Sequence, residues 1–91
     1  STVAPQALYL LNSPFVMEQA TAAAKQLLQE CPDSPSARVE RAFQETLGRL
    51  PTRGEREVVM AAVTDSSVDP QQAWAMTYQS LFGCIDFRTL E

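Results

Sequence analysis

Apolar residues recur at steps of three and four positions along most of the chain, which is the spacing of an amphipathic α-helix. Three stripes show this spacing: Val16, Ala20, Ala23, Ala24, Leu27 and Leu28; Val39, Ala42, Phe43 and Leu47; and Ala73, Trp74, Thr77, Tyr78, Leu81 and Phe82. Polar residues hold the other side of each segment. The pattern predicts helices that bury their apolar faces in a common core.

Prolines and small polar residues mark where these helices begin. Pro5, Pro14, Pro35 and Pro70 each stand at or next to a residue that can cap a helix. Proline is favoured in the first helical turn because its missing N–H has no partner there. Together with the stripes, these signals predict five helices: three over about 4–12, 14–30 and 35–47, a fourth between Thr52 and the loop that starts at Asp65, and a last one from Pro70 to Gly83.

The fourth segment admits two interpretations. Residues 58–63 are rich in valine, which favours a buried strand. The preceding Thr52-Arg53-Gly54-Glu55, however, fits a capping box, in which threonine and glutamate satisfy each other's backbone N–H groups at the start of a helix. Apolar residues at positions 58, 59, 62 and 63 also have helical spacing. We therefore expect a helix.

The chain is expected to end in an extended segment. Gly48 and Gly83 are placed to stop the third and fifth helices, because glycine adopts the left-handed conformation of a helix end without strain. Beyond Gly83, Ile85 and Phe87 alternate with polar residues, as in extended chain. The predicted fold is all-α: one domain over residues 1–91, a compact bundle of about five short helices with an extended C-terminal tail.

Charge and hydropathy argue against two classes of partner. The chain has 7 Lys and Arg against 11 Asp and Glu, a net charge of −4, so it lacks the basic field that collects nucleic-acid phosphates. A helix-turn-helix nucleic-acid module is the least favoured alternative. No window approaches 18 consecutive apolar residues, so we expect no membrane insertion.

Residues that carry chemistry are few. The sequence contains no histidine, which removes the commonest general base and the usual partner of a serine or cysteine nucleophile. Its carboxylates fall on predicted polar faces, caps or loops, and its isolated glycines form no phosphate-binding loop. Cys31 and Cys84 fit neither a zinc nor a redox spacing, which leaves free thiols and a disulfide both open. We expect no metal, no cofactor and no enzymatic activity.

The methionines and aromatic residues are expected in the core. Without a histidine or a haem-attachment motif, Met17, Met60 and Met76 are interpreted as core fillers and not as haem ligands. The stripe of Trp74, Tyr78 and Phe82 is interpreted in the same way, with a peptide-binding groove as the alternative.

Positive charge is concentrated around the third and fourth helices. The five arginines there are Arg38, Arg41, Arg49, Arg53 and Arg56, and glutamates are interleaved with them. The spacing predicts four-residue ion pairs from Arg41 to Glu45 and from Glu45 to Arg49. A solvated ion-pair network is the favoured interpretation, and the alternative is a docking face for an acidic neighbour.

Several motifs together resemble a known family. They are Pro5-Gln6-Ala7-Leu8, Asn12-Ser13-Pro14-Phe15-Val16, Arg41-Ala42-Phe43, Leu47-Gly48-Arg49-x-Pro51-Thr52-x-x-Glu55, Ala73-Trp74 and Ile85-Asp86-Phe87-Arg88. In this order they resemble the C-terminal part of a planctomycete domain-of-unknown-function family (domain of unknown function fifteen-fifty-three). The resemblance implies a piece of a long, exported protein that often carries an N-terminal cytochrome-c-like domain, and it implies no activity.

Most residues of these motifs have a structural explanation, since Ser13, Pro14, Gly48, Pro51 and Glu55 are helix start and stop signals and Phe15 and Trp74 are expected in the core. The candidates for interaction are the remainder: Asn12, Arg41, Arg49, Asp86, Phe87 and Arg88. We expect a structural or interaction module that contacts other domains of the same polypeptide or a protein partner. The alternative is that Asn12, Arg41 or Arg88 completes an active site formed by other domains.

Overall fold

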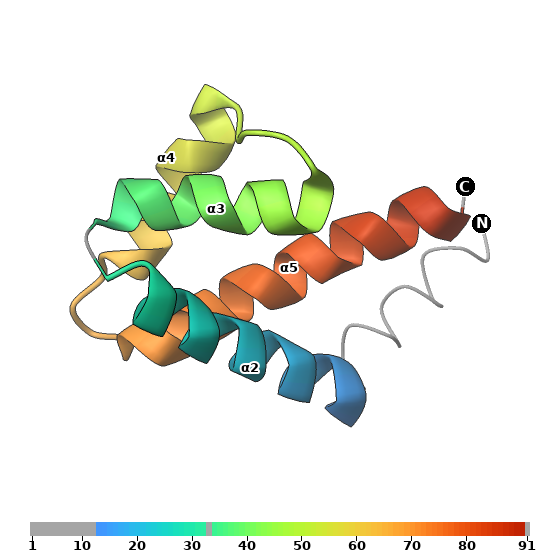
Figure 1. The fold of residues 1–91 in the computed structure, drawn as a ribbon, viewed down its shortest axis with the longest axis horizontal. Helices are drawn as coiled ribbons and strands as arrows, with labels where there is room; N and C mark the ends of the chain where they lie inside the picture. The colour runs from blue at the N-terminus through green and yellow to red at the C-terminus, as the bar shows by residue number, and fades with distance from the viewer. Residues whose placement is uncertain (1–12, 33, 91) are drawn as a thin grey trace.

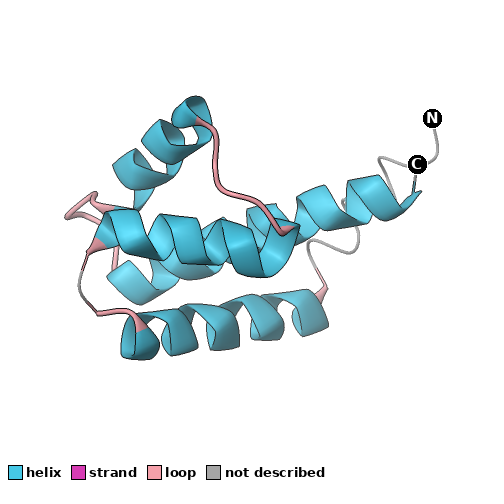
Figure 2. Cartoon of the chain, turned by 45° about the horizontal axis from the view of Figure 1, so that its top comes forward, coloured by secondary structure: helices cyan, strands magenta, loops and turns pink. Residues whose placement is uncertain are grey.

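A computed structural model describes residues 13–32 and 34–90 of the chain, and side chains are described up to Cys84. This part of the chain contains four helices and no strand: α2 (Pro14–Glu30), α3 (Pro35–Leu47), α4 (Arg53–Val63) and α5 (Pro70–Leu90) (Figures 1 and 2). The all-α class is therefore confirmed. Four helices are described instead of the five predicted, because the helix expected at 4–12 lies outside the described residues.

The helix α5 is the centre of the arrangement. It contacts each of the other three helices and lies antiparallel to α2 along most of the length of that helix (Figure 1). Helix α3 lies across the other side of α5, and α4 crosses behind α3 in this view. The last turns of α5 extend past the ends of the other helices.

Small polar residues next to three of the prolines cap the helices. The side-chain oxygen of Ser13 accepts a hydrogen bond from the N–H of Val16 at 3.2 Å, and that of Ser34 accepts from Ala37 at 3.1 Å. Each cap satisfies one of the N–H groups that a first helical turn leaves without a partner. In the same way, Asp69 accepts from the N–H of Gln72 at 3.2 Å and begins α5.

The extended C-terminal tail was predicted wrongly. Helix α5 continues through Gly83 to Leu90, so residues 85–88 belong to its last turns. Glycine ends a helix where its backbone takes a positive φ, and among the described residues Gly48 alone does so, at 71°. Gly83 is buried in mid-helix, and the alternation of Ile85 and Phe87 spans too few residues to stop propagation once a helix has formed.

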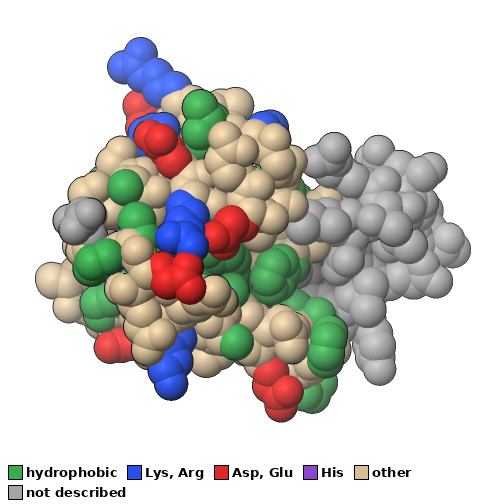
Figure 3. All heavy atoms as spheres, viewed as in Figure 1, with side chains coloured by type: hydrophobic (Ala, Val, Ile, Leu, Met, Phe, Trp, Pro, Cys, Tyr) green, Lys and Arg blue, Asp and Glu red, His purple; other side chains and the backbone are tan. Residues whose placement is uncertain are grey.

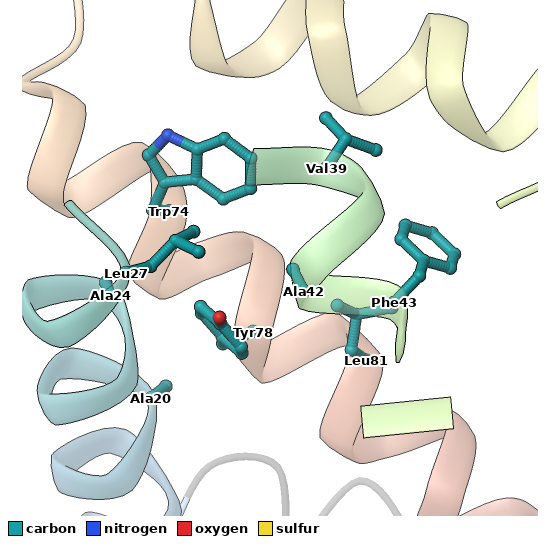
Figure 4. Packing of buried hydrophobic residues seen from close by; sticks show 9 residues of the cluster. All are labelled: Ala20, Ala24, Leu27, Val39, Ala42, Phe43, Trp74, Tyr78 and Leu81. Atoms are coloured by element: carbon teal, nitrogen blue, oxygen red, sulfur yellow. The ribbon is translucent and has the colours of Figure 1, made fainter. Parts of the chain in front are cut away.

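The core lies where α2, α3 and α5 meet. Trp74 and Tyr78 of α5 and Val39 of α3 are its largest fully buried side chains, and all three point into the same cluster (Figure 4). On α2 the buried positions include Ala20 and Ala24, whose small side chains let the backbones of α2 and α5 approach closely. The three predicted stripes thus supply the core, with their end residues half-buried.

Several residues expected in the core are exposed instead. The side chain of Phe15 is 68% exposed because Phe15 lies five residues before Ala20, roughly 140° around the helix from it. Met76 is 57% exposed, because it stands two residues from both Trp74 and Tyr78 and faces away from them. Met17 is exposed as well, and of the three methionines Met60 packs against the core.

Candidate interaction surface

An ion-pair network joins three helices on one face of the molecule. Arg41 of α3 is paired with Glu30, the last residue of α2, and its Nε donates to Glu45 Oε1 at 2.8 Å one turn further along α3. The hydroxyl of Tyr78, on α5, donates to the other oxygen of Glu45 at 3.4 Å. Figure 3 shows positive and negative side chains close together near the centre of the face that it views. The network ties α2, α3 and α5 together at the edge of the core.

The charges in this network stabilise one another. The pKa of Glu30 is lowered by its hydrogen bond from Gln26 and by the guanidinium of Arg41. The pKa of Arg41 is raised by its hydrogen bonds to Glu45 and Glu30. Burial raises the pKa of the Tyr78 phenol, and the nearby charge of Glu45 raises it further, so this hydroxyl stays protonated and remains a donor.

A second arginine, Arg49, bridges the loop between α3 and α4 by an ion pair with Glu55. Arg49 binds Glu55 with both of its terminal nitrogens, at 2.8 and 3.0 Å, and its guanidinium lies 5.8 Å from the centre of the Phe43 ring. The same carboxylate accepts from the N–H of Thr52 at 2.8 Å, and the Thr52 hydroxyl accepts from the N–H of Glu55 at 3.2 Å. The predicted capping box is therefore present. Arg49 adds an ion pair to the box. The hydrogen bonds from Arg49 and Thr52 lower the pKa of Glu55 to about 2, so its carboxylate stays charged at neutral pH.

The other three arginines around α3 and α4 also bind groups of this chain. Arg38 donates to the carbonyl oxygens of Cys31 at 2.6 Å and Pro32 at 3.0 Å, which holds the chain as it leaves α2. Arg56 on α4 reaches Glu40 on α3 at 3.2 Å, and it also donates to Ser36. The remaining pair, Arg53 with Glu57, lies in solvent at 3.5 Å. The predicted Arg41–Glu45 pair is present, whereas the predicted Glu45–Arg49 pair is wrong, because Arg49 turns to Glu55.

An apolar groove of about 750 Å³ lies between α4 and α5, with Phe43 and Leu47 of α3 at its base. We call it the α4–α5 groove. None of the 11 residues of α4 is buried, and Val58, at the groove, is 71% exposed. The sequence indicated an apolar face on this helix at 58, 59, 62 and 63 but gave no partner for it. In the fold Val59 and Val63 pack against the core, whereas Val58 and Ala62 stay exposed. Val58, Val59 and Ala62 line the groove.

Metal-ligating side chains do not cluster in the part of the chain that the structure describes. No group of three or more His, Cys, Asp and Glu residues forms a metal-binding cluster within residues 13–32 and 34–90. Cys31 is half-buried and Cys84 is exposed, and both are free thiols. Among the described helices, none is long and apolar enough to cross a membrane.

A match to a protein-family model shows which family the chain belongs to. The model of the family described as PSD1, Protein of unknown function (DUF1553), matches residues 1–63. The chain belongs to the DUF1553 family. The match includes α2, α3 and α4, so the motifs at Ala73-Trp74 and Ile85-Asp86-Phe87-Arg88 lie beyond it. Neither the curated proteins nor the solved structures contain a significant match to the chain.

The candidate residues of this DUF1553 chain fall into separate places. Arg41 belongs to the three-helix network, whereas Arg49 forms the ion pair with Glu55 at the start of α4, so the structure does not bring the two arginines together. Asn12 lies outside the described residues. The last three candidates, Asp86 to Arg88, have a described backbone in the final turns of α5, but their side chains lie outside the description. Within the matched range, Arg49, Thr52 and Glu55 act as one structural unit.

Proposed function

We propose that this DUF1553 chain is a non-catalytic structural or protein-interaction module, which packs against other domains of a larger polypeptide or against a protein partner. The observation that carries the proposal is the α4–α5 groove. It exposes apolar side chains on a helix that buries none of its residues, and exposed apolar surface of this kind is typical of interaction sites.

The state of the charged residues supports the same proposal. Arginines that bind substrates or cofactors must offer donors to them, whereas the five from Arg38 to Arg56 all donate to groups of this chain. All buried side-chain nitrogen and oxygen atoms in the described residues have hydrogen-bond partners. A role for Arg41 in an active site completed elsewhere would require Arg41 to leave two carboxylates.

The resemblance extends the proposal to the whole protein. That resemblance implies a long, exported planctomycete protein that often carries a cytochrome-c-like domain. We therefore propose that the chain works outside the cytoplasm as the helical C-terminal part of such a protein.

Calorimetry tests the proposed module. The 91-residue chain is titrated with the remainder of its parent polypeptide, and saturable binding is expected. No binding up to high micromolar concentration would contradict the proposal. In the intact parent, Arg41→Ala is expected to leave any turnover unchanged, and a loss of turnover without a lower melting temperature would favour the active-site alternative.

A further inference from the structure

The α4–α5 groove has the dimensions needed to bind a helix. Helix α4 presents Gly54, Val58 and Ala62 to it at four-residue steps, so this wall is about 12 Å long at a rise of 1.5 Å per residue. Helix α5 forms the opposite wall from Ala73 to Cys84, about 16 Å long by the same rise. The glycine and alanines along these walls leave room for a third helix to approach closely. Two to three turns would fit.

The chemistry of the walls selects the type of occupant. Apart from Glu55 and Asp65 the lining is apolar or small and uncharged, so an occupant needs apolar anchors. An added strand needs the free edge of a sheet, and residues 13–32 and 34–90 contain no sheet. An amphipathic helix with anchors three, four and seven residues apart meets both conditions.

Charge distinguishes the two ends of the groove. Glu55, at one end, is already neutralised by Arg49. Asp65, at the other end, accepts two hydrogen bonds from Ser67 and forms no ion pair with the described residues. It follows the C-terminus of α4, where backbone carbonyls concentrate partial negative charge and the last turn contains no basic residue. A lysine or arginine of an occupant would be stabilised there, whereas a second copy of this chain would bring a further net charge of −4.

We propose that the α4–α5 groove binds an amphipathic α-helix of a partner protein, with apolar anchors between α4 and α5 and a lysine or arginine beside Asp65. This inference rests on the proposed function and specifies the surface and the partner. Val58, Ala62 and Met76 supply the exposed apolar contacts, and Asp65 sets the direction in which the helix lies.

Designed peptides test the inference on the whole chain. The probe is a fluorescein-labelled helical peptide of about 14 residues, with leucines on one face and lysines at one end; a second peptide has glutamates in place of the lysines, and a third has the same composition scrambled. We expect anisotropy to show binding of the lysine peptide, at least about threefold weaker binding of the glutamate peptide, and no binding of the scrambled peptide.

Groove variants supply the controls. Val58→Gln is expected to weaken binding of the lysine peptide by about fivefold to tenfold, because it removes an apolar contact from the centre of one wall. Leu50→Gln removes a similarly exposed aliphatic side chain outside the groove and should leave binding unchanged. Asp65→Asn keeps an acceptor for Ser67 and should abolish the preference for lysine over glutamate. Circular dichroism confirms that each variant is folded.

Several results would overturn the inference: no binding of the lysine peptide, equal binding of the lysine and glutamate peptides, an affinity that Val58→Gln does not change, or a dimer of the chain that Val58→Gln dissociates. The titration with the parent polypeptide separates this failure from failure of the proposed function. If the parent binds Val58→Gln as tightly as wild type, the groove inference fails and the interaction module stands. If neither peptide nor parent binds, both fail.

Discussion

At the scale of single residues, the start of α4 shows how one motif fixes a local structure. Thr52 and Glu55 satisfy each other's backbone N–H groups, and Arg49 holds Glu55 from the preceding loop. No residue of α4 is fully buried, although Val59, Met60 and Val63 pack against the core, so these contacts add to a modest packing contribution. The threonine and the glutamate could be recognised from the sequence. The partner of Arg49 could not, because Glu45 and Glu55 are both within reach until the turn at Gly48 is known.

Thr52→Ala is expected to lower the free energy of unfolding by about 1 kcal/mol, because the N–H of Glu55 loses its acceptor. Urea denaturation measures the change. The matched control is Thr64→Ala at the other end of α4, where the hydroxyl only adds a bond to the carbonyl of Met60, and its effect should stay within about 0.5 kcal/mol. Equal losses in the two variants would show that Thr52 is no cap.

Glu55 should make stability depend on pH in acid. Its pKa is about 2 in the folded chain, against an ordinary value of 4.5, so the unfolded chain binds the proton more readily. The stabilisation is therefore present above pH 4.5 and is lost as the pH falls toward 2. The Glu55 side chain is 36% exposed, so solvent screening reduces this contribution to stability. Denaturant unfolding from pH 6 to pH 2 should show a smaller loss in Glu55→Gln; equal slopes would contradict the assignment.

At the scale of elements, the sequence located α2, α3 and α5 because each has caps and an uninterrupted stripe, and α4 because of its capping box. It failed at the end of α5, where Gly83 was interpreted as a stop although nothing local forces its φ to be positive. It also could not locate the α4–α5 groove. A groove depends on the angle at which two helices cross, and that angle is set by packing between distant residues.

The contact between α2 and α3 can be tested through Glu30 and Arg41. A double-mutant cycle with Glu30→Ala and Arg41→Ala should give a small favourable coupling that decreases as salt is added, because both side chains are partly exposed. The cycle for the more exposed pair Arg53 and Glu57 should give a smaller coupling. Coupling of equal size in the two cycles would mean that the Arg41 network does not tie the helices together.

At the scale of the whole molecule, a small core stabilises an open arrangement of helices. Trp74 is its largest fully buried side chain, and it lies among side chains of α2, α3 and α5. Trp74→Ala should therefore cost about 3–5 kcal/mol, a large part of the stability of a domain of this size. Met76→Ala is the control, since Met76 is on the same helix but largely exposed. Thermal unfolding followed by circular dichroism measures both variants. Equal melting temperatures would show that Trp74 contributes no more to stability than Met76 does.

In the proposed module, a partner covers α4 and the α4–α5 groove. Amide hydrogen exchange tests this coverage most directly, by comparing the 91-residue chain alone with the same residues in the intact parent protein. A helix without buried residues should exchange quickly in the isolated chain. We expect slower exchange across Arg53–Val63 in the parent, with α2 little changed. Identical exchange of α4 in the two samples would contradict it.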